Sequence, residues 1–207
     1  MYFQPKFNKE TPNRKSYHLN LFVKNLQGYK NLCHIMTKAN TEQFYYKPIV
    51  DLKLLNKYKE GLICTTACIL SYTSQAILNG HRDMAEKMLD KFKEMFGSDL
   101  YIEIQPYRID DAGTQQRTDY ELMQMARRKK IKCILTSDSH FGKKEDFDTY
   151  CKMHEIGHTT LDVKRTYSER YMPSEYEICE RFAKTYSKKF KRPMELAEQF
   201  VDNMKEI

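Results

Sequence analysis

The sequence predicts an α/β protein, because segments that resemble strands alternate with segments that resemble helices. Short apolar runs rich in β-branched or aromatic residues, which are typical of strands, stand at residues 19–23, 62–68, 100–104 and 132–137. Helical patterns lie between these runs, and such alternation indicates βαβ units with a parallel sheet. Four strands of this kind would form roughly half of a closed eight-stranded β/α barrel.

The helices are predicted from the spacing of apolar residues. The stretch "GYKNLCHIMTKAN" has apolar residues at i, i+3, i+4 and i+7, namely Tyr29, Leu32, Cys33 and Met36. This spacing predicts one apolar helix face. A long helical pattern then runs to Phe96 with an interruption at Asn79-Gly80, and Gly97 is a natural stop. The sequence "TDYE" at residues 118–121 has the form of a capping box and predicts the start of the next helix.

The pattern changes beyond about residue 160, where the sequence becomes polar and irregular. Two helices are expected there, one capped by Ser174 with Glu177 in the box position and one that begins at Pro193. The last helix carries an apolar stripe that needs a partner surface: Ala197, Phe200, Val201 and Met204. We therefore expect a main domain over residues 1–160 and a helical extension over residues 161–207.

Composition narrows the class of protein. The chain has no apolar run of about 18 residues and its N-terminus lacks the apolar core of a signal peptide, so a cytosolic (cytoplasmic) protein without membrane contact is expected. The six cysteines form no CxxC pair, which indicates reduced thiols that lie mostly in the core. The net charge of +7 suits a polyanionic partner such as nucleic acid, and it also fits a basic protein that binds none.

Four residues are candidate metal ligands. Asp138 and His140 follow the last predicted strand, at the edge that carries the chemistry in α/β barrels, and strand residues i and i+2 share a face. Carboxylate and imidazole bind zinc, manganese or iron, although a surface turn also explains this pair. Cys68 ends a predicted strand and His18 precedes the first one. Taken alone, Cys68 also fits a small core residue and His18 also fits a hydrogen-bonded histidine.

Four segments, in the same order and at similar distances, resemble the PHP (polymerase and histidinol phosphatase) domain of bacterial C-family DNA polymerases, the polymerase III alpha subunits. These are "YHLNLFVKNLQGYKNL", "FYYKPIVDLKLLNKYKEGLICTTAC", "FKEMFGSDLYIEIQPY" and "ARRKKIKCILTSDSHFGKKEDFD". The tail "YMPSEYEICERF" resembles the stretch of that family that leads toward the polymerase palm. The resemblance implies a partial, distorted β/α barrel followed by a helical linker.

The same resemblance implies a metal site and a role in DNA replication. His18, Cys68, Asp138 and His140 match ligand positions of a cluster that binds zinc or manganese, and some members use it for 3′–5′ exonuclease or phosphoesterase chemistry. The HxH motif of the family, a further His and a Glu would precede Met1, and the polymerase aspartates would follow the chain. We therefore expect a truncated section that is inactive alone and works with the rest of the polymerase and, through it, with DNA. A stand-alone PHP phosphoesterase and a non-catalytic structural piece of the replicase are the alternatives.

Overall fold

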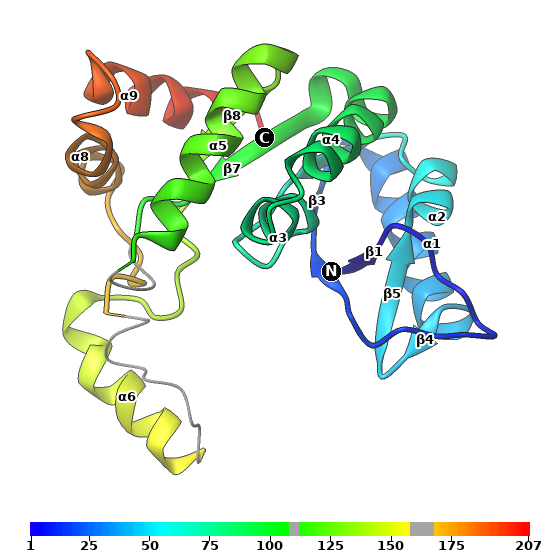
Figure 1. Ribbon diagram of the computed structural model, residues 1–207. Coiled ribbons are helices and arrows are strands. Elements are labelled where there is room, and N and C mark those ends of the chain that lie inside the picture. The colour runs from blue at the N-terminus through cyan, green and yellow to red at the C-terminus, as the bar shows by residue number, and fades with distance from the viewer. Residues whose placement is uncertain (108–111, 158–167) are drawn as a thin grey trace. The chain divides into compact units, whose positions relative to one another are not determined.

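The computed structural model describes residues 1–107, 112–157 and 168–207 and has a mixed α/β architecture (Figure 1). The chain divides into two compact units. Unit 1 comprises residues 1–103, 124–132 and 207, and unit 2 comprises residues 104–123 and 133–206. The domain boundary expected at residue 160 falls in 158–167, outside the described residues.

The strands of unit 1 pair in two groups. The first group contains β1 (Tyr2–Gln4), β2 (Tyr17–His18), β4 (Phe44–Tyr45) and β5 (Lys47–Asp51). In it, β1 pairs antiparallel with β2 and parallel with β5, and β5 pairs antiparallel with β4. The second group contains β3 (Asn20–Val23), β6 (Leu62–Thr65) and β7 (Leu100–Ile104). In the described part of the chain, the pairings form open sheets and close no barrel.

Among the four predicted strands, the expected parallel pairing is wrong in one place, and the strands that were not predicted add two antiparallel pairings. β6 pairs parallel with β7, as expected, but β3 pairs antiparallel with β6. The reason is β5, which lies between β3 and β6 in the chain but pairs with β1 instead. β3 and β6 are therefore not successive strands of one βαβ unit. The sequence analysis missed β5 because it begins with Lys47 and Pro48, and only two residues of the strand are strongly apolar.

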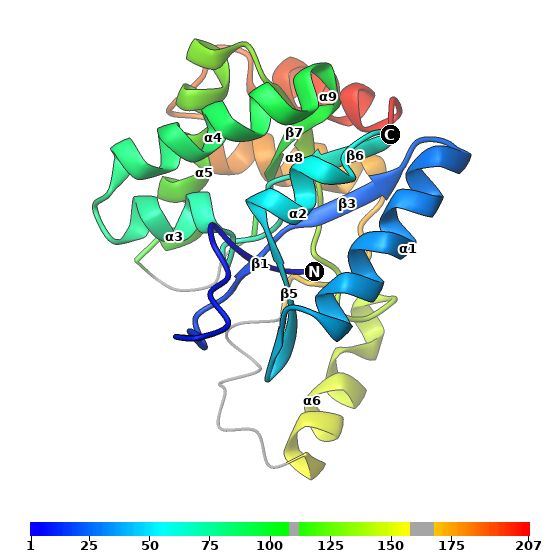
Figure 2. The same cartoon turned by 90° about the vertical axis from the view of Figure 1, so that its right-hand side faces the viewer.

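Helix α1 (Leu26–Thr41) lies beside β3 (Figure 2), but its buried face differs from the predicted one. The buried residues are Gly28, Asn31, Ile35 and Ala39. From the predicted face, Tyr29 is 57% exposed and Met36 is 39% exposed. The buried face begins with a glycine whose hypothetical Cβ would stand only 1.8 Å from the carbonyl oxygen of Gly61. The close approach of the Gly28 and Gly61 backbones therefore orients this helix. The spacing of apolar residues gives no information about such a contact.

The other helices of unit 1 are α2 (Leu52–Lys57), α3 (Tyr72–Leu78) and α4 (Arg82–Phe96). The interruption predicted at Asn79-Gly80 is confirmed, because α3 ends at Leu78 and α4 begins at Arg82. Gly97 ends α4 with a φ of 55°, as predicted. The apolar repeat of α4 is buried: Ala85, Met88, Leu89, Phe92 and Phe96. This helix contributes two phenylalanines, Phe92 and Phe96, to the core of unit 1.

Unit 2 contains α6 (Phe147–Ile156), α8 (Glu175–Tyr186) and α9 (Pro193–Met204), and it shares α5 (Thr114–Lys129) and β8 (Lys132–Leu135) with unit 1. The predicted start of α5 is wrong: the helix begins before "TDYE", and the Thr118 hydroxyl donates to the carbonyl oxygen of Thr114 at 2.9 Å. The first turn, "TQQR", has no apolar residue, so the apolar spacing could not reveal it.

The two C-terminal helices form as predicted and lie side by side in Figure 1. Ser174 and Glu177 make a reciprocal capping box at the start of α8, and Pro193 is the first residue of α9. The apolar stripe of α9 packs on α8, where the rings of Phe182 and Phe200 lie 5.6 Å apart. Asn203 also donates to the carbonyl oxygen of Cys133 at 2.8 Å. The stripe thus finds its partner surface within unit 2.

All six cysteines are free thiols. Four are buried, Cys68 is half-buried and Cys33 is exposed, so the prediction of mainly core thiols is confirmed except at Cys33. Among the described residues, no helix is both long and apolar enough to cross a lipid bilayer.

Candidate metal centre

Two of the predicted ligands, His18 and Cys68, lie in unit 1. The Cys68 Sγ atom stands 3.3 Å from Nδ1 of His18. β6 ends at Thr65, three residues earlier than predicted, and Cys68 follows in a loop. Ala67 in that loop has a φ of 58°, an uncommon left-handed conformation for a residue with a side chain. This turn of the backbone, together with a hydrogen bond of 3.0 Å from the His18 amide to the Leu70 carbonyl, brings the two side chains together.

A buried carboxylate in unit 1 was missed by the sequence analysis. Glu103 on β7 is only 5% exposed. It accepts hydrogen bonds from Asn20 Nδ2, at 2.8 Å, and from the Thr65 hydroxyl. Its amide also donates to the Thr66 hydroxyl at 3.0 Å. The sequence does contain a signal for it, an acidic residue inside the apolar strand "LYIEI". A carboxylate in such a strand is buried, and a buried carboxylate needs hydrogen-bond donors around it.

The other two predicted ligands, Asp138 and His140, lie in unit 2, in the loop after β8. The Asp138 Oδ2 atom is 3.8 Å from His140 Nε2. The pair is close, but not through alternation along a strand, because β8 ends at Leu135. Asp138 has a φ of 44°, which is a left-handed conformation that aspartate tolerates better than most residues. A turn of the backbone, rather than the alternation of side chains along a strand, therefore brings Asp138 and His140 together.

Arg170 completes this cluster and was also missed. Its side chain is 8% exposed, and its Nη1 atom donates to Asp138 Oδ2 at 2.7 Å. The same Nη1 atom is 3.0 Å from His140 Nε2. The backbone supports the contact, because the His140 amide donates to the Arg170 carbonyl at 2.7 Å. Nothing in the sequence pointed to Arg170, since it comes from an irregular segment 30 residues beyond His140.

Tyr107 lies against Arg170 and fixes the orientation of the cluster. The Arg170 Cζ atom stands 4.5 Å from the centre of the Tyr107 ring, within the range of a cation–π contact. The Tyr107 hydroxyl lies 2.7 Å from Gln105 Oε1 and 3.2 Å from Asp138 Oδ2. Burial lowers the pKa of His140 below its usual value, and the Arg170 charge lowers it further while Asp138 opposes the change. The imidazole is therefore neutral at pH 7, as a metal ligand must be.

A buried acid, Asp119, links this cluster to the packing of unit 2. Asp119 is 1% exposed. It accepts hydrogen bonds from Gln115 Nε2 at 2.8 Å, the Gln105 amide at 3.2 Å and the Tyr186 hydroxyl at 3.2 Å. Burial raises the pKa of Asp119 to about 8, against the opposing effect of these donors. The acid thus stays largely protonated near neutral pH and holds the segment that carries Tyr107.

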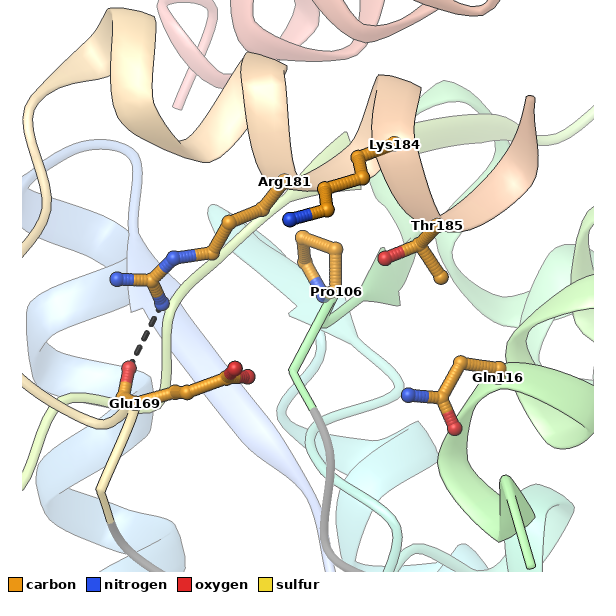
Figure 3. A pocket seen from close by; sticks show the side chains of 6 residues that line it. All are labelled: Pro106, Gln116, Glu169, Arg181, Lys184 and Thr185. Carbon is orange, nitrogen blue, oxygen red and sulfur yellow. Dashed lines mark hydrogen bonds between the residues drawn. The ribbon is translucent and has the colours of Figure 1, made fainter. Parts of the chain in front are cut away.

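A pocket of about 420 Å³ lies beside the cluster in unit 2 (Figure 3). It is lined by Pro106, Gln116, Glu169, Arg181, Lys184 and Thr185. In Figure 3, Arg181, Lys184 and Thr185 project from α8, and the guanidinium of Arg181 reaches toward Glu169. Arg181 donates to the Glu169 carbonyl at 2.7 Å and lies 4.6 Å from the centre of the Tyr171 ring. The wall of the pocket thus combines two basic residues, Arg181 and Lys184, with one acidic residue, Glu169.

The chemistry of the predicted ligands suits a transition metal, since imidazole, thiolate and carboxylate are the groups that bind zinc. Each unit supplies two of them, and within the described residues no group of three or more His, Cys, Asp or Glu is arranged to hold a metal ion. The His18–Cys68 pair fits the role of partial ligand set. The Asp138–His140 pair has suitable atoms, but both of these atoms contact the guanidinium of Arg170.

Comparison with known proteins decides the family. The sequence model of the family described as the PHP domain matches residues 1–107, which is more than half of the chain. The chain belongs to the PHP domain family. His18 and Cys68 lie inside the matched residues, whereas Asp138 and His140 lie beyond them.

Curated relatives extend the similarity of this PHP chain beyond residue 107. It is 35% identical over 174 residues to the DNA polymerase III subunit alpha of Borreliella burgdorferi, covering 82% of this chain and 15% of the relative. It is 39% identical to that of Aquifex aeolicus, covering 63% of this chain and 11% of the relative. Similarity to the Chlamydia pneumoniae subunit, at 30% identity, covers 94% of this chain and 17% of the relative. The chain thus spans about a sixth or less of the length of these relatives.

Proposed function

We propose that the chain is a section of a DNA polymerase III alpha subunit and serves DNA replication in the company of the remaining polymerase. The observation that carries this proposal is the similarity to proteins of that name along 94% of the chain, from the PHP region into the C-terminal helices. Residues 1–160 would form the later part of a distorted PHP-type barrel. Residues 161–207 would form the helical linker toward the polymerase palm, and DNA would be contacted through the complete replicase.

The proposal includes a metal centre to which His18, Cys68, Asp138 and His140 contribute. A bound zinc or manganese ion would supply an activated water and a charge that stabilises a phosphate ester during cleavage. The chain's own residues prepare the ligands: burial keeps His140 neutral, and the left-handed turn at Asp138 directs its carboxylate toward His140. Because two ligands per unit cannot enclose a metal cluster, exonuclease activity would require segments from the rest of the polymerase.

A co-purification experiment tests the replicase role. The chain would be tagged at its C-terminus, expressed from its own gene and isolated, and the proteins bound to it would be identified by mass spectrometry. We expect polypeptides with polymerase III alpha sequence, and 3′–5′ exonuclease activity only in fractions that contain them. The tag alone is the control. A chain that purifies without such partners and hydrolyses a small phosphate monoester would favour the stand-alone phosphoesterase instead.

A further inference from the structure

We infer that Arg170 is a built-in cation that occupies the Asp138–His140 pair in place of a metal ion, so that metal binds there only when the guanidinium leaves. This inference rests on the proposed metal centre and adds a residue that controls it. It also assigns a role to a side chain that lies outside the residues matched by the PHP family model.

The contacts of Arg170 are those a metal ion would need. Its Nη1 atom lies 2.7 Å from Asp138 Oδ2 and 3.0 Å from His140 Nε2. Oxygen and imidazole ligands hold zinc at about 2.0–2.2 Å. A divalent ion bound to the same two atoms would therefore stand very close to the guanidinium charge. Repulsion between the two cations in a part-buried site excludes their simultaneous binding.

Arg170 is held in this position from three sides. Its side chain is 8% exposed, and the face of its guanidinium lies 4.5 Å from the Tyr107 ring centre. Its backbone carbonyl accepts from the His140 amide, so the segment stays attached to the ligand loop even without the side chain. A buried guanidinium requires a counter-charge, and Asp138 supplies it. Asp138 and His140 therefore already have a cationic partner within the chain.

Zinc titration of two matched variants tests this inference. Arg170→Met removes the charge and keeps a side chain that can cover Tyr107. Arg181→Met is the control, because Arg181 also lies over a tyrosine ring and donates to a backbone carbonyl, but these contacts are with Tyr171 and Glu169 rather than with Asp138 or His140. The zinc dissociation constant would be measured by competition with a chromophoric chelator. Melting temperature would be measured with and without zinc.

We expect Arg170→Met to bind zinc about tenfold more tightly or better than the unmodified chain, since a competing hydrogen bond between charged groups is lost. It should melt at a lower temperature without zinc and recover when zinc is added. Arg181→Met should bind zinc as the unmodified chain does. The gain should vanish in the double variant Asp138→Asn/Arg170→Met.

Several results would overturn the inference: equal zinc affinity in Arg170→Met, an equal gain in Arg181→Met, or a gain that survives Asp138→Asn. If Arg170→Met does not fold, Arg170→Gln replaces it, because glutamine retains a hydrogen-bond donor without the charge. Failure of the metal centre itself is a separate result. It would be shown by zinc binding to the unmodified chain that neither Asp138→Asn nor Cys68→Ser weakens, whatever Arg170→Met does.

Discussion

The polar contacts around α1 in unit 1 differ from those around Asp119 and Arg170 in unit 2. Around α1, unit 1 relies on neutral contacts: Asn25 caps the helix by accepting from the Gly28 amide, and Asn31 Nδ2 donates to the Glu60 carbonyl at 2.8 Å. Unit 2 relies on buried ionisable groups, Asp119 and Arg170. The packing of α1 should therefore depend on shape and little on pH, although unit 1 also buries two carboxylates elsewhere, Asp51 and Glu103. The order of unit 2 should depend on protonation and on bound cations.

Several of the residues that carry the family resemblance have structural roles in α1. The segment "KNLQGYKNL" carried much of the resemblance, and its Asn25, Gly28 and Asn31 all have structural roles in α1. Similarity at these positions reports the fold of unit 1 rather than its chemistry. The chemical question is decided at His18 and Cys68 and, in unit 2, at the contacts of Arg170 with Asp138 and His140.

The largest effect is expected from Gly28→Ala, which disrupts the close approach of Gly28 in α1 to Gly61. The added Cβ would stand 1.8 Å from the Gly61 carbonyl oxygen, a contact that the two backbones must separate to relieve. We expect a loss of about 3 kcal/mol or more in the free energy of unfolding, although alanine normally favours a helix over glycine. Urea unfolding followed by circular dichroism measures it.

Gly142→Ala is the matched control for that substitution. Among the described residues, its added Cβ would meet only the Asp146 carboxylate at 3.5 Å, an ordinary van der Waals distance. We expect little change in its urea midpoint. Should Gly28→Ala unfold at the same urea concentration as the unmodified chain, the close approach of Gly28 and Gly61 would not be what orients α1.

The second effect concerns pH and Asp119 in unit 2. Its pKa is raised to about 8 in the folded chain from an ordinary value of 3.8. The folded state therefore retains a proton that the unfolded state releases, so the stabilisation is fully present below about pH 4 and is lost as pH rises through about 8. Asp119→Asn remains neutral at every pH and should remove this part of the pH dependence.

Urea midpoints at pH 5 and pH 8.5 test that expectation. Between these values the unmodified chain should lose at least about 1 kcal/mol more stability than Asp119→Asn does. Asp202→Asn, at an exposed position on α9, is the control and should follow the unmodified chain. Parallel pH profiles for Asp119→Asn and the unmodified chain would mean that the buried acid does not titrate in this range.

The sequence revealed elements whose signal is local. The apolar repeat of α4, the capping box of α8 and the start of α9 at a proline could be predicted because each depends on neighbouring residues. The strand β5 was missed because a charged residue and a proline begin it. The buried face of α1 was misassigned because its close contact is made by a glycine, and burial of a residue without a side chain leaves no apolar pattern.

In the candidate site, too, the contacts between neighbouring residues could be predicted and the long-range contacts could not. Asp138 and His140 are two residues apart, so their proximity could be predicted even though a turn, rather than a strand, produces it. Arg170 comes from 30 residues further along the chain, and only folding shows that its guanidinium faces the pair. Charge does not indicate which of the many basic residues is buried. A contact between residues so far apart in the chain follows from the tertiary structure, and no local sequence pattern indicates it.

The smallest expected effect is the loss of stability when the N-terminal cap of α1 or of α8 is removed. It compares a neutral cap with a cap that contains an ionised residue. Asn25 caps α1 with an amide oxygen, whereas Ser174 caps α8 in a box with Glu177. At pH 7, Asn25→Ala and Ser174→Ala should each cost about 1 kcal/mol of stability. The box at Ser174 also contains an ionised partner, because hydrogen bonds from the Ser174 amide and hydroxyl lower the pKa of Glu177.

A lowered pKa gives stability that is present above the ordinary value of 4.5 and is lost as pH falls through the folded value. Urea midpoints at pH 7 and pH 3 should therefore show a smaller cost of Ser174→Ala at the lower pH, where Glu177 becomes protonated. The cost of Asn25→Ala should stay constant, since an amide oxygen does not titrate. Equal pH dependence of the two variants would contradict the distinction between the neutral cap of α1 and the cap of α8 that contains an ionised glutamate.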